Sequence, residues 1–200
     1  MSDTIASRPC GIKLSLWHFF FHYLGALPVQ ILLFLGGSLA VCHHFGIWMA
    51  EIVLAVPFIL FSGFVGLSYW SSRRFFQEFD LVPGQIISMD PIIFACCTNM
   101  SRSWGRPVWA VKVEKLKVGS IPNAKVGHTF ACAASYDLPQ GRMDAWSNFY
   151  PRPCTQATFD TRILEQKKQE IGSELFGRLA HYVESGQIPR YNLDPPFKYV

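Results

Sequence analysis

LWHFFFHYLGALPVQILLFLGGSLAVCHHFGIWMAEIVLAVPFILFSGFVGLSYW, residues 16–70, is the stretch that decides how this chain is organised. It contains one formal charge, Glu51, and Ser71-Ser72-Arg73-Arg74 follow it directly. An α-helix rises 1.5 Å per residue, so about 20 residues already cross a ~30 Å hydrocarbon core. Because the stretch is far too long for one spanning helix, we expect two spans that form a transmembrane helical hairpin.

The predicted hairpin occupies residues 23–74 and follows an N-terminal tail and interfacial segment at residues 1–22. Its first span, Tyr23–Val41, carries a proline, which a membrane helix tolerates as a kink. Its second span, Ile52–Trp70, ends in an aromatic pair typical of a membrane boundary. Residues 12–22 are rich in aromatic side chains and either lie in the headgroup layer or begin the first span.

The composition also favours a membrane protein. Half of the residues are hydrophobic, only 16% are charged, and the mean hydropathy is +0.19, whereas about a quarter of the residues in soluble domains are charged. A secretory signal peptide is the main alternative, but its apolar core measures only about 7–15 residues. We therefore expect an uncleaved anchor that contacts the lipid bilayer. The net charge of +4 is too small to predict nucleic-acid binding.

The positions of the basic residues predict the orientation of the hairpin. Arg8 and Lys13 flank one end, Arg73 and Arg74 flank the other, and the connecting loop contains neither lysine nor arginine. Because cytoplasmic flanks are enriched in lysine and arginine, both termini should face the cytoplasm. The sequence thus predicts a multi-pass protein of the bacterial inner, or cytoplasmic, membrane.

Three polar residues near the predicted outer loop raise the question of an ion or metal site. Glu51 is either an intramembrane relay group or, if the second span begins at Ile52, a carboxylate at the outer surface. His43 and His44 are either part of a pH-sensing or metal-binding cluster or members of a plain polar turn. Adjacent histidines without a further spaced ligand favour the turn, so we expect no metal site.

Residues 75–187 should form a cytosolic α+β domain built on a mainly antiparallel sheet. Alternating or β-branched runs predict its strands, and Pro83-Gly84 predicts a turn where the domain begins. Residues 137–158 contain three prolines and are expected to be a loop. The predicted strands are Gln85–Met89, Ile92–Thr98, Val108–Glu114 and His128–Tyr136.

Two helices are expected to close this domain. Asp160 is a plausible N-cap for a helix over Thr161–Ile171, and Ser173 for a second one over Glu174–Val183. Residues 188–200 carry three prolines and should form an extended C-terminal tail. The predicted fold class is therefore α+β with a membrane anchor: a two-helix transmembrane hairpin, a small antiparallel sheet and two C-terminal helices.

Candidate binding residues lie in two loops of the predicted domain, Asn99–Pro107 and Asp144–Arg152. Such loops on a sheet scaffold commonly carry binding residues, and tryptophan, tyrosine and arginine are enriched at binding hot spots. The alternative is that the aromatic rings cap the ends of the sheet. The candidates are Trp104, Arg106, Trp146, Asn148, Tyr150 and Arg152.

Common enzyme signatures are missing from the sequence. It contains no phosphate-binding loop, no dinucleotide-binding glycine motif, no H-E-x-x-H and no G-x-S-x-G. Cys96 and Cys97 are adjacent in a predicted strand, where they point to opposite faces and cannot bind one metal together. We expect no catalytic residue and no cofactor.

Two functions remain open at this point. The favoured one is a non-catalytic module that binds a protein partner or small ligand, or self-associates through the hairpin. The alternative is a subunit of a small oligomeric transporter, channel or membrane enzyme.

The part from Leu81 to Val183 resembles an uncharacterised bacterial domain family of unknown function. The resemblance is carried by Pro83-Gly84-Gln85-Ile86-Ile87, by Val108-Trp109-Ala110-Val111-Lys112-Val113, and by Trp146-x-x-Phe149-x-Pro151-Arg152-Pro153. It implies a small sheet with helices in a membrane-associated bacterial protein. It implies no activity, and it does not include the hairpin.

Overall fold

A computed structural model describes residues 8–23, 47–101, 107–117, 119–137, 145–189 and 197–200 of the chain. The chain divides into two compact units. Met1–Lys13 and Arg74–Val200 form the first, which we call the sheet unit, and Leu14–Arg73 form the second, which we call the helical unit. The candidate binding residues of the loops all belong to the sheet unit.

The helical unit is built from α1 (Leu16–Tyr23) and from α3 (Ile47–Glu78) up to Arg73. The ring of Phe19 in α1 packs edge-to-face against Tyr69 in α3, with 5.3 Å between the ring centroids. The hydroxyl of Tyr69 donates to the carbonyl of Leu14 over 3.2 Å. These contacts hold the start of α1 against the second half of α3.

The predicted transmembrane hairpin is wrong. Among the residues that the structure describes, no helix combines the length and the apolarity needed to cross a membrane. Helix α1 has 8 described residues, and α3 continues past Trp70 through Arg73 and Arg74 to Glu78. A spanning helix needs about 20 consecutive residues that are mainly apolar.

Several predictions about the hairpin fall on residues outside the described part. Residues 24–46, which include most of the first predicted span together with His43 and His44, are among them. Glu51 lies within α3, but its side chain is not described.

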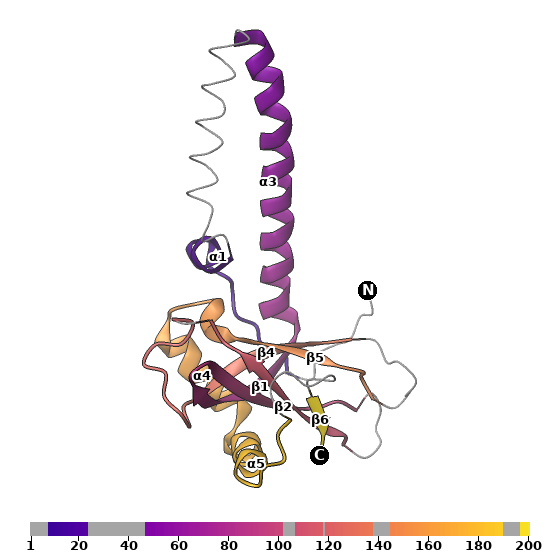
Figure 1. The fold of residues 1–200 in the computed structure, drawn as a ribbon, viewed down its shortest axis with the longest axis vertical. Coiled ribbons are helices and arrows are strands. Elements are labelled where there is room, and N and C mark those ends of the chain that lie inside the picture. The colour runs from indigo at the N-terminus through magenta and orange to yellow at the C-terminus, as the bar shows by residue number, and fades with distance from the viewer. Residues whose placement is uncertain (1–7, 24–46, 102–106, 118, 138–144, 190–196) are drawn as a thin grey trace. The chain divides into compact units, whose positions relative to one another are not determined.

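The sheet unit contains one curled, six-stranded antiparallel sheet (Figure 1). Every pairing between neighbouring strands is antiparallel. The spatial order is β5-β4-β1-β2-β3-β6, which places β1 and β2 near the middle and β5 and β6 at the edges. The strands are β1 (Asp80–Met89), β2 (Ile92–Asn99), β3 (Trp109–Lys115), β4 (Thr129–Tyr136), β5 (Phe149–Pro153) and β6 (Phe197–Tyr199).

The strands at Val108–Glu114 and His128–Tyr136 are confirmed, because β3 and β4 cover them almost completely. The turn predicted at Pro83-Gly84 is wrong, since both residues lie inside β1. A Cβ atom on Gly84 would lie 2.9 Å from both Sγ of Cys132 and the ring of Phe130. Because Gly84 has no side chain, the side chains of Cys132 and Phe130 on β4 can pack closely against β1. Close approach to a neighbouring group is a common reason for glycine inside a strand.

The loop predicted over residues 137–158 is also partly wrong, because it contains β5. This strand has prolines at positions 151 and 153 and pairs with β4 on one side only. Proline is tolerated in an edge strand, where its missing N–H removes no internal hydrogen bond of the sheet. Prolines therefore do not exclude a strand at the edge of a sheet, which the prediction of a loop did not consider.

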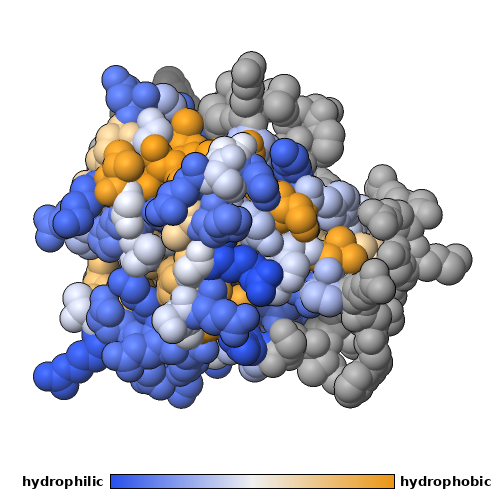
Figure 2. All heavy atoms as spheres, turned by 90° about the horizontal axis from the view of Figure 1, so that it is seen from below, coloured by the Kyte–Doolittle hydropathy of each residue, from blue (hydrophilic) through white to orange (hydrophobic). Residues whose placement is uncertain are grey.

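Helices α4 (Thr161–Ile171) and α5 (Ser173–Glu184) pack against the sheet, α4 over β4 and β1 and α5 over β1 and β2. The predicted N-cap of α4 is confirmed, since the carboxylate of Asp160 accepts from the backbone N–H of Arg162 over 2.9 Å. The predicted cap of α5 is wrong by one residue. Gly172, with a φ of 82°, ends α4 and precedes α5. The surface on the α5 side is largely hydrophilic, with apolar residues in a few separate patches (Figure 2).

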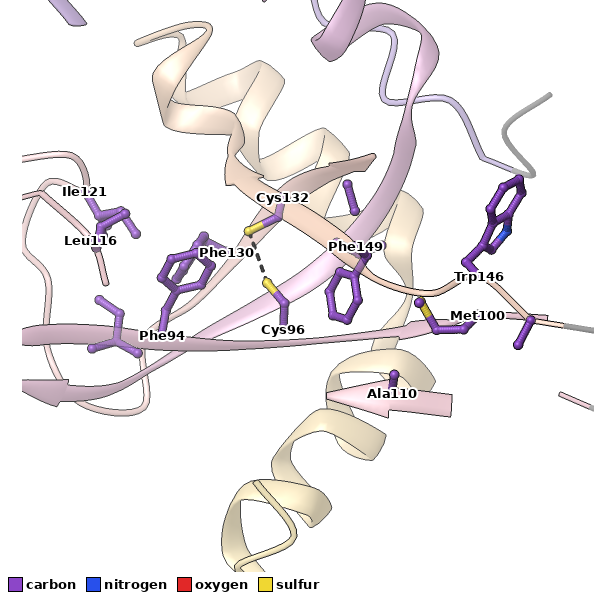
Figure 3. Packing of buried hydrophobic residues seen from close by; sticks show 14 residues of the cluster. Phe94, Cys96, Met100, Ala110, Leu116, Ile121, Phe130, Cys132, Trp146 and Phe149 are labelled. Carbon is purple, nitrogen blue, oxygen red and sulfur yellow. Dashed lines mark hydrogen bonds between the residues drawn. The ribbon is translucent and has the colours of Figure 1, made fainter. Parts of the chain in front are cut away.

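The two faces of the sheet bury different side chains. On one face, strands β1 to β5 and nearby loops form what we call the inner core, which contains the rings of Phe94, Phe130, Phe149 and Trp146 (Figure 3). On the other face, Cys97 and Val111 pack with Leu179 of α5 and their neighbours. Alternate residues of the same strand thus enter different cores, as the period of two in a strand requires.

Candidate functional site

A cavity of about 180 Å³ lies in the sheet unit where β1 begins and β2 and β4 end. It reaches the surface beside Arg8 and Asn99, which are both exposed. Both faces of the sheet contribute to its wall, because it sits at the strand ends. The lining residues are Arg8, Asp80, Leu81, Val82, Pro83, Cys97, Thr98, Asn99, Trp109, Tyr136 and Leu175.

The N-terminal segment supplies one side of this cavity. Arg8 lies alongside the start of β1, where its carbonyl accepts from the N–H of Leu81 over 2.8 Å. The N–H of Arg8 donates to Oδ1 of Asp80 over 3.1 Å, and Nη1 of Arg8 donates to the carbonyl of Ile171 over 3.2 Å. These contacts hold the Asp80 carboxylate and the Arg8 guanidinium at the same rim.

Two hydroxyl groups lie deeper in the wall. Oγ1 of Thr98 on β2 and the phenol oxygen of Tyr136 on β4 share a hydrogen bond of 2.7 Å. Burial raises the pKa of Tyr136, and the negative charge of Asp80 raises it further. The phenol therefore stays protonated at neutral pH and can act as a hydrogen-bond donor.

The remaining wall is mostly apolar. It includes Trp109 of β3 and Leu175 of α5. The guanidinium of Arg178 lies over the Trp109 ring, 4.3 Å from its centroid, and so fixes the orientation of the indole. Burial raises the pKa of Cys97 to about 12, so its sulfur is a neutral thiol at physiological pH. A neutral thiol is a poor nucleophile.

These groups suit ligand binding better than bond making. A hollow of 180 Å³ equals the liquid volume of about six water molecules and is smaller than the about 300–1,000 Å³ typical of drug-sized ligands. The wall offers a carboxylate, two hydroxyls and an indole to one small molecule. Within the described ranges, no three histidine, cysteine or acidic side chains are grouped so that they could hold a metal ion.

None of the four predicted binding residues that the structure describes lines this cavity. Trp104 and Arg106 lie outside the described residues. Trp146 is only 8% exposed and belongs to the inner core, with its ring 5.9 Å from that of Tyr136. The guanidinium of Arg152 lies over the ring of Phe75, 4.6 Å from its centroid. A binding role for these residues stays a prediction.

The structure brings two of the predicted residues, Asn148 and Tyr150, together around Lys112. Nζ of Lys112 donates to the Phe149 carbonyl over 2.7 Å and to Oδ1 of Asn148 over 3.4 Å, and it lies 4.3 Å from the Tyr150 ring centroid. It also pairs with the Glu114 carboxylate at 2.9 Å. Lys112 is almost completely buried. Its contact with β5 is possible only because the sheet curls, since three strands separate β3 from β5.

Local sequence patterns contain little signal for either group of residues. The alternation in β3 indicates that Lys112 points away from the apolar face, but it does not reveal that β5 covers that side. Asp80, Thr98 and Tyr136 come from three different strands, and Arg8 comes from a segment that was expected to be a tail. Only the pairing of the strands places these residues at one end of the sheet.

The helical unit carries a second candidate surface. Large apolar side chains are exposed along the described part of α3, including Phe64 at 64%, Leu67 at 69% and Trp70 at 55%. On α1, Trp17 is 75% exposed. Exposed apolar side chains that lie together on a helix usually mark an interaction site. The chemistry of this surface, with indoles among aliphatic and phenyl groups, is that of a membrane-contacting helix.

Comparisons with known proteins place the fold but not the function. A family model described as "Protein of unknown function (DUF3239)" matches residues 69–186. This match confirms the resemblance to an uncharacterised family over Leu81 to Val183. A crystal structure described as that of "a putative membrane protein from Corynebacterium diphtheriae" is similar with a TM-score of 0.52. The two sequences are 22% identical, and the similarity covers 60% of this chain and 100% of that one. No curated protein matches.

Proposed function

The chain belongs to the DUF3239 family, whose function is unknown, and we propose that it is a membrane-associated, non-catalytic binding module. In this proposal the helical unit contacts lipid, and the cavity of the sheet unit binds a small ligand. The single observation that carries the proposal is the row of exposed apolar side chains on α3. The similar structure from Corynebacterium diphtheriae, described as a putative membrane protein, supports the same environment.

Lipid explains the exposed surface of the helical unit better than water does. Burial of apolar surface contributes roughly 25 cal/mol per Å², so each large side chain that leaves water contributes on the order of 1.5–3 kcal/mol. Phe61, Phe64, Leu67 and Trp70 follow one another at three-residue intervals and are all exposed. Trp70 has the amphipathic ring that favours the headgroup region. Exposed Arg73, one turn later, adds attraction to anionic headgroups.

We place this association at the cytoplasmic face of a bacterial membrane. Anionic lipids give that leaflet a negative surface potential, which attracts nearby lysine and arginine. The sheet unit and both chain ends would then lie on the cytoplasmic side. Cys97 fits this setting, because a buried thiol of raised pKa remains reduced and neutral in the cytoplasm.

A small cationic ligand suits the cavity. The Asp80 carboxylate offers a hydrogen-bond acceptor with negative charge, and the hydroxyls of Thr98 and Tyr136 offer further polar contacts. The indole of Trp109 offers an aromatic surface on which a cationic group binds well. An anionic ligand would instead meet the Asp80 charge at short range, while the Arg8 guanidinium at the same rim already donates to the Ile171 carbonyl.

Vesicle flotation tests the membrane part of the proposal. The full chain is mixed with vesicles of phosphatidylglycerol and phosphatidylethanolamine, and the floating fraction is compared with that of a Phe64→Ser, Leu67→Ser double variant. We expect the variant to bind vesicles at least tenfold more weakly, because two exposed apolar groups are lost. Val126→Ser changes an equally exposed apolar residue of the sheet unit and serves as the matched control. Equal flotation of all three proteins contradicts the proposal.

Two small probes of opposite charge test the cavity. Ethylammonium and acetate are similar in size, so saturation-transfer NMR of each probe with the full chain isolates the effect of charge. We expect transfer to ethylammonium and little to acetate. In the Asp80→Asn variant the preference should vanish, because the side chain keeps an acceptor for the Arg8 N–H but loses its charge. Equal transfer to both probes with the unaltered chain removes the cationic assignment.

A further inference from the structure

Two buried thiols meet at the N-terminal edge of the sheet unit. Sγ of Cys10 lies 3.6 Å from Sγ of Cys154, although 144 positions separate the residues in sequence. Both residues are fully buried. Cys10 belongs to the same short segment as Arg8 of the cavity wall, and Cys154 begins the 3-10 helix η1 (Cys154–Gln156) directly after β5. The sulfur contact therefore joins the N-terminal segment to a distant part of the unit.

The segment around Cys10 is thin and lies at the surface. Backbone N–H groups of residues 10–12 donate to carbonyls of residues 76–79 over 2.8–3.2 Å. Pro9 and Gly11, on either side of Cys10, are exposed. A small solute reaches the thiol pair when only this segment lifts, and the rest of the sheet can stay folded. Local openings of a single surface segment need less free energy than global unfolding.

The two thiols differ in acidity because of their contact. The hydrogen bond from the Cys154 thiol lowers the pKa of Cys10, and the positive charge of Lys167 lowers it further, against the effect of burial. The same hydrogen bond, together with burial, raises the pKa of Cys154. Cys10 is thus the more acidic of the two thiols. A more acidic cysteine beside a second thiol is the usual arrangement of a redox-sensing pair.

We propose that Cys10 and Cys154 are a redox-active pair, which a peroxide converts into a disulfide that fastens the N-terminal segment to the sheet unit. The Cys10 thiolate attacks one peroxide oxygen, the O–O bond breaks, and hydroxide leaves with the electron pair. The product at Cys10 is a sulfenic acid. The Cys154 sulfur then attacks the Cys10 sulfur, an S–S bond forms, and the oxygen leaves as water with the thiol proton.

Formation of the disulfide requires only a small movement of the two sulfur atoms. A disulfide bond is about 2.05 Å long, so the sulfurs, now 3.6 Å apart, must approach by about 1.5 Å. The N-terminal segment can supply this movement because it is held along one side. The disulfide between Cys10 and Cys154 would keep Arg8 fixed at the cavity rim. With both thiols reduced, the N-terminal segment could move and the rim could open. Peroxide would in this way change access to the cavity.

A second thiol pair provides an internal control. Sγ of Cys96 lies 3.5 Å from Sγ of Cys132, nearly the same distance (Figure 3). These residues come from β2 and β4, which pair with β1 on its two sides. Two strand spacings separate their Cα atoms by about 9–10 Å, beyond the about 7 Å that a disulfide spans. We expect this pair to stay reduced under conditions that oxidise Cys10 and Cys154.

Peptide mapping after peroxide treatment tests the proposal. The full chain carrying Cys42→Ser is treated with hydrogen peroxide, denatured, alkylated and digested without reductant. We expect a Cys10–Cys154 cross-linked peptide, with Cys96 and Cys132 recovered alkylated. The Cys154→Ser variant should lose the cross-link and accumulate a sulfenic acid at Cys10, which dimedone traps. Peroxide treatment should raise the melting temperature of the parent protein. The same treatment should leave the melting temperature of the Cys10→Ser variant unchanged.

Two results would overturn the proposal. One is full alkylation of Cys10 and Cys154 after peroxide treatment, with no cross-linked peptide. The other is a Cys96–Cys132 cross-link in equal yield. That result would show that peroxide oxidises any two neighbouring thiols of this unit and does not select Cys10 and Cys154. Neither measurement depends on the variants folding, because both are made on the unaltered pairs, and neither depends on lipid or probe binding.

Discussion

The sheet unit and the helical unit contain the same kinds of apolar residue and place them in opposite ways. In the sheet unit, Phe94 and Phe149 are buried in the inner core. In the helical unit, Phe64, Leu67 and Trp70 are exposed. The buried rings of the inner core pack against one another, whereas Phe64 and Leu67 of the helical unit keep most of their surface exposed. The comparison teaches that residue type alone does not distinguish a core from a contact surface.

The largest expected effect separates the two units by stability. Phe94→Ala removes a buried ring from the inner core and should lower the free energy of unfolding by about 3–5 kcal/mol. Phe64→Ala removes an equally large ring from the exposed part of α3 and should change it by less than about 0.5 kcal/mol. Urea-induced unfolding of both variants in the absence of lipid measures the difference. Similar losses for both variants would show that Phe64 is also a core residue.

Alkaline pH should weaken the sheet unit through its buried acids. The folded-state pKa of Cys97 is raised from 9.0 to about 12, so the unfolded chain loses this proton first as pH rises. The stabilisation is therefore complete below pH 9 and declines between pH 9 and 12, by about 1.4 kcal/mol per pH unit. Tyr136, whose pKa is also raised, adds to the decline above pH 10.

The variant Cys97→Ala isolates the contribution of this thiol. Between pH 9 and 11, the free energy of unfolding of the variant should fall less steeply with pH than that of the parent protein. The difference in slope should correspond to one proton fewer released on unfolding. Denaturant titrations at three pH values in that range suffice. Identical slopes for parent and variant would contradict the assignment of a buried, neutral Cys97.

Glycine substitutions should have opposite signs in the two units. Gly84→Ala places a methyl group 2.9 Å from Sγ of Cys132 and from the Phe130 ring, so overpacking should cost about 1–3 kcal/mol. Gly66→Ala in α3 meets no atom within 4 Å and should stabilise the helix by roughly 0.5–1 kcal/mol. Thermal unfolding of the two variants compares them directly. A neutral Gly84→Ala would mean that β1 and β4 can separate without loss.

The sequence predicted those parts of the sheet unit that repeat a simple local pattern. Alternation identified β3 and β4, and the Asp160 cap identified the start of α4. Proline and glycine misled at Pro83-Gly84 and in β5, because the same residues that make turns also fit close strand contacts and sheet edges. Whether such a residue makes a turn, a close strand contact or a sheet edge depends on which strand, if any, pairs with it. The sequence of one segment alone does not contain that information.

The candidate site was beyond local patterns for a related reason. The cavity combines Arg8 with Asp80, Thr98 and Tyr136, which lie far apart in sequence and meet only through strand pairing. The hairpin prediction failed differently, since it counted uncharged residues over a long stretch. Among the residues that the structure describes, no helix has both the length and the apolarity that a membrane span needs.

The most direct test of the account compares two equally exposed apolar positions, Phe64 at 64% in the helical unit and Val126 at 62% in the sheet unit. An exposed cysteine is introduced at each position by Phe64→Cys or Val126→Cys, in a Cys10→Ser, Cys42→Ser background, and labelled with an environment-sensitive fluorophore. On addition of phosphatidylglycerol-containing vesicles, the emission at position 64 should shift to shorter wavelength and that at position 126 should not. A shift at position 126 alone, at both positions equally, or at neither would contradict the claim that the helical unit is the surface that meets lipid.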